Sequence, residues 1–389
     1  MDKLDALLDF TEEHIDEEHV RRTEPLHLDV MAYRPVPHLP LTLIYPPDDV
    51  ELLPYEEAFE DPEKMLYNEL VRTVGGTSTY TSILLKGDFP PHIRSNHGIG
   101  ILPSLFGARC RIINNNMPWV EHMELDEIRK AAGKGVPDLN QALVKRVLDT
   151  HHYYLEKLKG YPKCFRCVRI TQPDLQGPFD IAHLLIGNDV FLGVVDYPDL
   201  VHELLDVVTD TYIAFRKKVD PLLTDRTGDG AVYLHGCMCG GKVLLKDDTA
   251  IINLSEEMHR SFSKAYNDRI FEAFGGGSMH YCGPSRAWAH EAVGSPWLRG
   301  VNYGNPEMQN LAQEYAYWRE RKLPILLWGD SLCGEPLDRA FLDDVCSLGI
   351  RTGMSLAIRV KNQEEARAVL DEHRRAAGHR RDHEVQTGS

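Results

Sequence analysis

Hydrophobic and polar positions follow two different periods along this chain from about residue 137 onward. Apolar runs with the two-residue period of strands occur at 165–170, 231–235, 279–282, 298–302, 324–328 and 354–360. Apolar residues with the three- and four-residue spacing of amphipathic helices occur at 138–158, 180–185, 200–219, 255–274, 306–321, 339–348 and 363–374. One strand and one helix recur at intervals of roughly 30–40 residues, the size of a βαβ unit, so the pattern predicts a parallel sheet.

The number of repeats, about seven or eight, favours a closed barrel over an open sheet. The predicted fold class is therefore α/β, a (β/α)8 TIM barrel with an N-terminal extension. We expect one barrel domain over residues 1–378, with 1–60 forming an N-terminal arm and helix, and a disordered tail over 379–389. No G-x-G-x-x-G follows a strand and no P-loop is present, so the dinucleotide and nucleoside-triphosphate fingerprints are absent.

Composition narrows the class of protein. The chain has 389 residues, 43% hydrophobic and 26% charged, which is typical of globular proteins. The formal net charge of −16 argues against a nucleic-acid binder, because phosphate affinity needs clustered lysine and arginine. No apolar run reaches the ~20 residues of a membrane helix, and the acidic N-terminus lacks the signal-peptide pattern. Eight cysteines in this length do not make a disulfide scaffold, so we expect a cytoplasmic protein with reduced thiols.

The strongest candidate chemistry lies after the glycine run 275–277. His280 and Cys282 stand two residues apart, so in a strand both side chains lie on one face. At the carboxyl end of a barrel strand that face points into the active site. Imidazole and thiolate are ligands that zinc prefers. The segment therefore predicts an active-site strand with a candidate metal site.

Two other segments carry candidate site residues. His235, Cys237 and Cys239 form a second cluster of imidazole and thiol groups, a rival metal site. Asp247 and Asp248 are adjacent, so in an extended segment they face opposite ways and only one enters the site. Either carboxylate is a candidate general acid or base.

Several blocks of the chain resemble the uroporphyrinogen decarboxylase superfamily. Gly177-Pro178-Phe179 with the later Val201-His202-Glu203-Leu204-Leu205 is similar to its "GPF…vh.LL" block, and Asp247-Asp248-Thr249 with Asn253-Leu254-Ser255 to its "DD…n.lS" segment. His280-Tyr281-Cys282-Gly283 resembles the "H-x-C-G" of its cobalamin-linked zinc methyltransferase branch. The resemblance covers about residues 165–375 and implies a (β/α)8 barrel with its site at the carboxyl ends of the strands.

The chain departs from both branches of that superfamily. The decarboxylase branch has an arginine-rich N-terminal motif, whereas Arg34, Arg72 and Arg94 stand alone here. The methyltransferase branch has a third cysteine near the last strand, where this chain has Ser355. Cys333 and Cys346 lie upstream and are candidates for the third ligand.

The resemblance implies methyl transfer between a corrinoid and a thiol or other small substrate, with zinc as the cofactor and the corrinoid carried by a separate protein. Two alternatives remain: a metal-independent decarboxylase or lyase acting on a small carboxylic acid or tetrapyrrole, and a barrel that binds a corrinoid or tetrapyrrole without turnover.

Expected partners are a small-molecule substrate, a corrinoid protein and a second copy of the chain as a homodimer, with neither nucleic acid nor membrane. Candidate catalytic residues are Asp247, Asp248 and His280, and candidate substrate-binding residues are Gln176, His97, His235 and Tyr281.

Overall fold

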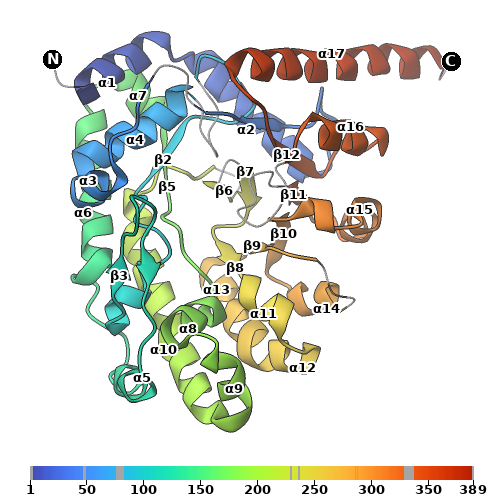
Figure 1. Cartoon of the computed structure of the whole chain (residues 1–389). Coiled ribbons are helices and arrows are strands. Elements are labelled where there is room, and N and C mark those ends of the chain that lie inside the picture. Colours follow the sequence, from blue (N-terminus) through green and yellow to red (C-terminus); the bar gives the residue numbers. More distant parts are fainter. Residues whose placement is uncertain are drawn as a thin grey trace.

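The computed structural model describes residues 3–46, 50–75, 83–227, 230–234, 237–284, 286, 288–327 and 337–387. For residues 75, 234, 237, 292 and 377–387 only the backbone is described. The chain forms strands surrounded by helices, with α17 projecting along one side (Figure 1). Both ends of the chain lie on this side of the molecule (Figure 1).

The main sheet has six parallel strands in the order β1-β12-β11-β10-β9-β8. These strands are β1 (Leu41–Ile44), β8 (Leu244–Lys246), β9 (Gly277–Tyr281), β10 (Leu298–Tyr303), β11 (Ile325–Leu327) and β12 (Met354–Arg359). A second parallel pair consists of β2 (His92–Arg94) and β5 (Arg169–Thr171). The antiparallel pairs are β3 (Cys110–Arg111) with β4 (Trp119–Val120), and β6 (Ala231–Leu234) with β7 (Cys237–Gly240).

Helices account for most of the remaining chain. The N-terminal half contains α1 (Lys3–His14), α2 (Glu17–Met31), α3 (Tyr55–Glu60), α4 (Pro62–Gly75), α5 (Leu125–Ala132), α6 (Ala142–Leu158), α7 (Pro162–Cys167), α8 (Pro178–Ile186) and α9 (Asp189–Asp196). The C-terminal half contains α10 (Pro198–Val219), α11 (Asp248–Asn253), α12 (Glu256–His259), α13 (Ala265–Phe274), α14 (Ala289–Val293), α15 (Leu311–Glu320), α16 (Arg339–Ser347) and α17 (Gln363–Thr387). Short 3₁₀ turns occur at Pro103–Phe106, Asp220–Leu222 and Pro306–Met308.

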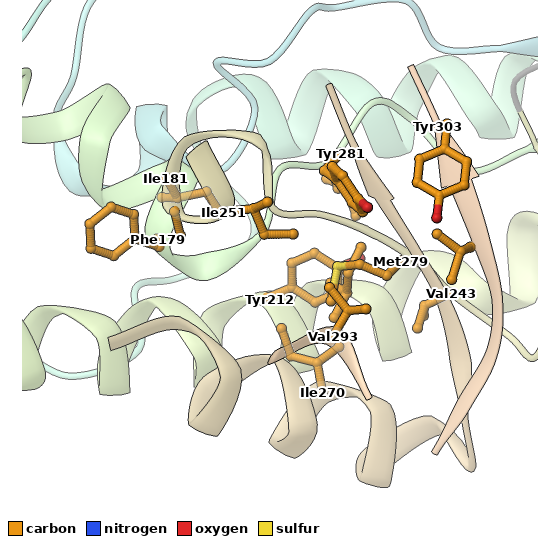
Figure 2. Packing of buried hydrophobic residues seen from close by; sticks show 14 of the residues in the cluster. Phe179, Ile181, Tyr212, Val243, Ile251, Ile270, Met279, Tyr281, Val293 and Tyr303 are labelled. Carbon is orange, nitrogen blue, oxygen red and sulfur yellow. The ribbon is translucent and has the colours of Figure 1, made fainter. Parts of the chain in front are cut away.

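The two faces of the main sheet differ in chemistry. Met279 and Tyr281 of β9 are buried in the main hydrophobic core with residues of the surrounding helices. Figure 2 shows this packing, with Tyr281 and Tyr303 beside Met279 and Val293. The alternate residues of β9, including His280, belong to the opposite face. There the register joins one row of residues across five strands: Lys246, His280, Asn302, Leu326 and Ser355.

The β6–β7 hairpin lies between the two parallel sheets. β7 contacts β9, β10 and β12, while β6 contacts β5. Its side chains Val232 and Cys239 pack with Leu244 and Leu326, residues of the main sheet. The hairpin therefore packs against the face of the main sheet that carries Leu244 and Leu326 (Figure 1).

Most strands expected from the pattern are present, and two expectations need correction. The alternation at 165–170 was expected to be a strand, but α7 extends to Cys167 and β5 begins only at Arg169. The carboxylate of Glu12, from α1, accepts hydrogen bonds from the backbone N–H groups of Lys163 and Cys164. This tertiary cap satisfies the helix start and overrides the local alternation. The strand at 231–234 exists, but it belongs to the antiparallel hairpin and not to the parallel sheet.

The expected closed barrel is seen as two parallel sheets. Within the described residues no strand ladder joins the β2–β5 pair to the six-stranded sheet. One backbone hydrogen bond of 2.9 Å runs from Gly177 N to Lys246 O, linking the segment after β5 to the end of β8. A Cβ on Gly177 would lie 2.1 Å from that carbonyl oxygen, so this close approach requires glycine. The helix α17 continues to Thr387 and so covers residues 379–387 of the segment for which a tail was expected.

Among the described helices, none is by itself long and apolar enough to cross a membrane. The consecutive helices α8 and α9 meet the length and composition criteria only when combined, and they are bent by 108° at their junction.

Candidate metal centre

Three ligand-type side chains meet at the carboxyl end of β9. His280 is in β9, Cys282 follows the strand, and Asp248 begins α11 after β8. The distance from His280 Nε2 to Cys282 Sγ is 3.6 Å, and that from His280 Nε2 to Asp248 Oδ1 is also 3.6 Å. All three ligand atoms lie within 4.8 Å of one another. The structure thus brings together three of the residues expected at the site.

The orientation of the His280 ring is fixed by its other nitrogen. His280 Nδ1 lies 2.5 Å from Asn302 Oδ1, while Asn302 Nδ2 donates to the backbone oxygen of Leu326 at 2.9 Å. Because the Asn302 amide is thus held with its oxygen toward His280, Nδ1 carries the proton and Nε2 presents a lone pair to Asp248 and Cys282. Burial lowers the pKa of His280, which favours the neutral ring.

A glycine makes room for the three side chains. A Cβ on Gly304, just after β10, would lie 2.4 Å from Cys282 Sγ and 3.0 Å from His280 Cε1. Any larger residue there would displace the thiol or the imidazole. The backbone N–H of Cys282 donates to Asp248 Oδ1 at 2.6 Å, which ties the two ligands to each other.

The geometry fits a tetrahedral zinc ion. With zinc–nitrogen, zinc–oxygen and zinc–sulfur bonds of about 2.0–2.3 Å, tetrahedral ligand atoms lie about 3.3–3.6 Å apart. The two distances of 3.6 Å from His280 Nε2 match this range, and the Cys282 and Asp248 ligand atoms lie within 4.8 Å of each other. A nitrogen, a sulfur and an oxygen ligand leave the fourth position open, as in catalytic zinc sites.

The neighbouring carboxylate, Asp247, has different surroundings. Its Oδ2 lies 2.7 Å from His259 Nε2, and its Oδ1 accepts a hydrogen bond of 2.6 Å from Ser263 Oγ. All three side chains are buried. Ser263 belongs to a π-helical segment, Arg260–Lys264, between α12 and α13; such segments occur frequently at functional sites. Asp247 therefore contacts the helical layer, while Asp248 faces His280.

The backbone that carries Asp248 is anchored from two sides. The buried carboxylate of Asp180 accepts hydrogen bonds from the N–H groups of Asp248 and Thr249 at 3.0 and 2.8 Å. The backbone N–H of Asp247 donates to His280 O at 2.9 Å. Burial, and then the nearby carboxylates of Asp248 and Asp247, raise the pKa of Asp180 well above its usual range.

A second polar group lies beside His280 on the inner face. Lys246, the register partner of His280, forms an ion pair of 2.6 Å with Asp174. Arg94 of β2 lies 3.7 Å from the other oxygen of Asp174, and Gln176 Nε2 donates to Asp174 Oδ1 at 3.3 Å. Gln176, expected to bind substrate, is thus joined through Asp174 and Lys246 to the row that contains His280.

Other predicted residues lie elsewhere. His97 is buried with its ring 5.1 Å from that of Phe59, and burial lowers its pKa to about 3. Tyr281 is buried on the helix-facing side of β9, with its ring 5.3 Å from Tyr303 (Figure 2). Of the rival cluster, Cys239 is buried in the hairpin, while His235 and the side chain of Cys237 lie outside the described residues, as does Cys333.

Ser355 occupies the register row of His280 at the strand where the resemblance implies a cysteine. It is buried, and its hydroxyl has no hydrogen-bond partner among the described residues. The carboxylate of Asp248 supplies the third ligand-type group in the trio instead.

Four residues of this site were not singled out from the sequence: Asn302, Gly304, Lys246 and His259. A polar residue in an otherwise apolar strand is a usable signal for Asn302, because buried polar side chains need partners. Gly304 lies two residues beyond the strand predicted at 298–302, near the end of a strand where barrel sites are built. Lys246 ends β8, a strand that the alternation did not predict. His259 carries no such signal, because only the tertiary structure brings α12 to Asp247.

Comparison with known proteins supports the fold. No protein-family model matches the chain, and no curated protein matches it by sequence. Among solved structures, a methyltransferase from Methanosarcina mazei is similar, with a TM-score of 0.60 and 17% sequence identity. The match covers 90% of this chain and 97% of the methyltransferase chain. The chain therefore shares the overall fold of that protein over nearly its full length.

Proposed function

We propose that this protein is a methyltransferase that uses a zinc ion held by Asp248, His280 and Cys282, and that it is related to the uroporphyrinogen decarboxylase superfamily. The observation that carries the proposal is the convergence of three ligand atoms within 4.8 Å at the carboxyl end of β9. The fold shared with the Methanosarcina mazei methyltransferase agrees with it. The proposed substrates are a small thiol and a methyl-corrinoid presented by a partner protein.

The proposal includes a closed barrel. The eight parallel strands β1, β2, β5, β8, β9, β10, β11 and β12 occur along the chain in the order that a (β/α)8 barrel requires. The hydrogen bond from Gly177 to Lys246 and the position of the β6–β7 hairpin support closure around one interior. The candidate metal centre then lies at the mouth of that barrel.

The residues of the chain have distinct parts in the proposed reaction. Zinc, when bound, supplies Lewis acidity that lowers the pKa of a thiol, so that thiolate is available at neutral pH. Asn302 holds the proton on His280 Nδ1 and so keeps Nε2 available as a ligand. Lys246, paired with Asp174, provides a positive charge beside His280 for an anionic part of the substrate.

The cluster of Lys246, Arg94 and Asp174 favours a second candidate, a metal-independent lyase acting on a small carboxylic acid. Lys246 and Arg94 would hold the substrate carboxylate, and Asp248 would transfer the proton. This reaction needs neither zinc nor a methyl donor. Its activity would survive removal of all metal by a chelator.

The experiment combines metal analysis with a transfer assay. Purified protein is analysed for zinc and then incubated with methylcobalamin and a panel of small thiols. We expect about one zinc per chain and transfer of the methyl group from methylcobalamin to the thiol sulfur, which forms a thioether, breaks the cobalt–carbon bond to leave cob(I)alamin, and releases the thiol proton. Zinc and transfer should both be lost in His280→Ala and retained in Cys346→Ala, a matched thiol control on α16. A metal-free protein whose behaviour is unchanged by His280→Ala would overturn the proposal, and corrinoid binding without transfer to any thiol would support a non-catalytic barrel instead.

A further inference from the structure

Two glycine runs of this chain meet at the opposite end of the strands from the metal centre. Gly240 and Gly241 end the β6–β7 hairpin, and Gly275–Gly277 lead into β9. A Cβ on Gly241 would lie 2.5 Å from Gly276 O, and one on Gly240 would lie 2.5 Å from Arg299 O. The two backbones therefore touch, and only glycine permits this contact.

A cavity of about 610 Å³ opens beside this contact. It is lined by the amino-terminal ends of β9–β11, the base of the hairpin and the end of α2. Gly230 and Gly275, both at its edge, have φ values of +77° and +75°, and a Cβ on either would meet nothing within 4 Å. Glycine is favoured here by backbone conformation, and the absence of side chains keeps the cavity open.

Four positively charged side chains from four segments line the cavity: Arg34, Lys242, Arg299 and Lys322. Arg34 pairs with Asp29 at 2.6 Å. No carboxylate lines the cavity, and none of the described residues forms an ion pair with Lys242, Arg299 or Lys322. This concentration of positive charge contrasts with the net charge of −16 for the chain. A cavity lined by one sign of charge attracts ligands of the opposite sign.

The remaining lining of the cavity is apolar. Leu28 and Met31 of α2, Phe274 of α13, and Leu323 with Pro324 contribute hydrophobic surface. The backbone N–H groups of Gly275, Gly276 and Gly277 donate to carbonyl groups of neighbouring residues, so they are not available to a ligand. Side-chain charge and apolar contact, rather than backbone donors, would therefore hold a molecule here.

From these contacts we propose that the cavity is a second binding site, specific for a small molecule that joins an anionic group to an apolar body. The anionic group pairs with Lys242, Arg299 and Lys322, and the apolar part packs against Met31 and Phe274. Arg299 is suited to this because its Nη1 already donates to the carbonyl oxygens of Pro296 and Leu298, which fixes the guanidinium. The site does not depend on the proposed zinc chemistry.

The test uses 8-anilinonaphthalene-1-sulfonate, a fluorescent probe with a sulfonate on an aromatic body. We expect saturable binding with one site per chain that weakens between 50 and 500 mM NaCl, since screening acts on exposed charges. The double variant Lys242→Glu/Arg299→Glu should lose affinity by about tenfold or more. The control Lys130→Glu/Lys134→Glu, with the same change of net charge at the α5 end, should stay within about twofold of the parent.

Equal weakening by both double variants would show that only net charge matters and would overturn the proposal, as would unchanged binding in both. Circular dichroism checks the fold of each variant. If the charge reversal prevents folding, Lys242→Met/Lys322→Met replaces it, with an expected loss of about threefold. His280→Ala should leave the affinity for the probe unchanged, because the metal centre is at the other end of β9. Loss of probe binding in that variant would show that the probe binds at the metal centre, and it would contradict the proposal.

Discussion

Two segments of this chain contain the pattern His-x-Cys, and the fold treats them differently. In the first, His280 and Cys282 end a parallel strand, where their ligand atoms are 3.6 Å apart beside Asp248. In the second, the thiol that the structure describes is Cys239, two residues beyond His235-x-Cys237. It belongs to an antiparallel hairpin and is buried among Val232, Leu244 and Leu326. The Cys282 thiol thus lies beside an imidazole and a carboxylate, whereas the Cys239 thiol is surrounded by apolar side chains.

The largest effect is expected from filling the space that Gly304 leaves for the side chains of His280 and Cys282. In Gly304→Ala the new Cβ would lie 2.4 Å from Cys282 Sγ, so the thiol must move out of its place beside His280. We expect zinc affinity to fall by about 100-fold, which corresponds to about 2.7 kcal/mol. Competition with a fluorescent zinc chelator measures it.

Gly160→Ala is the matched control for this change. A Cβ there would lie 3.5 Å from its nearest neighbour, the ordinary contact distance. Its zinc affinity should equal that of the parent protein. If Gly304→Ala also binds zinc normally, the thiol does not contribute to the site.

A smaller effect is expected from the network behind Asp248. His259→Leu removes the partner of Asp247 Oδ2 and leaves a buried carboxylate with less support, which should shift the loop that carries Asp248. Changes of residues that position metal ligands typically cost 10- to 100-fold in metal affinity, and we expect about tenfold. His259→Gln retains an N–H donor and should restore most of the affinity. If the leucine and glutamine variants bind zinc equally, the network only stabilises the fold.

This network also shows where sequence reasoning ends. The alternation of apolar and polar positions predicted β9–β12 and the common face of His280 and Cys282, because strand period is a local property. It left open which of Asp247 and Asp248 faces the site, since the answer depends on His259 and Asp180, which are distant in the sequence. The helical start of α7 was missed because Glu12 caps it from another helix. Local pattern thus predicted strands and candidate ligands, and tertiary contacts determined the remaining features.

Substitutions in the β6–β7 hairpin region should change the stability of the protein and leave its metal affinity unchanged. Asp225 is buried beside the hairpin, where its backbone oxygen accepts from Tyr233 N, and burial raises its pKa to about 6. Because this folded-state pKa is above the unfolded value, the folded protein binds the proton more tightly and loses stability as pH rises from about 4 to about 6. Asp225→Asn should therefore raise the free energy of unfolding by about 1–3 kcal/mol at pH 8, with little change at pH 4.

Urea unfolding at the two pH values measures this effect, and zinc affinity provides the control. A gain that is equal at both pH values would show that the carboxyl of Asp225 does not titrate between them. A change in zinc affinity would connect the hairpin to the metal centre and contradict their separate roles.

The smallest effect is expected for Cys239→Ala. This change removes one buried sulfur from the cluster with Val232, Leu244 and Leu326, at a cost of about 1 kcal/mol in the free energy of unfolding. Zinc content should remain that of the parent. Loss of zinc in this variant would assign the metal to the hairpin instead.

The most direct test of the proposed centre is the absorption spectrum of the protein with cobalt(II) in place of zinc, because a thiolate ligand gives a sulfur-to-cobalt charge-transfer band. The spectrum is recorded for the parent protein, Cys282→Ala and Cys239→Ala. Our account predicts the band in the parent and in Cys239→Ala, and its loss in Cys282→Ala. A band that persists in Cys282→Ala, or that is absent from the parent, would contradict a metal centre built from Asp248, His280 and Cys282.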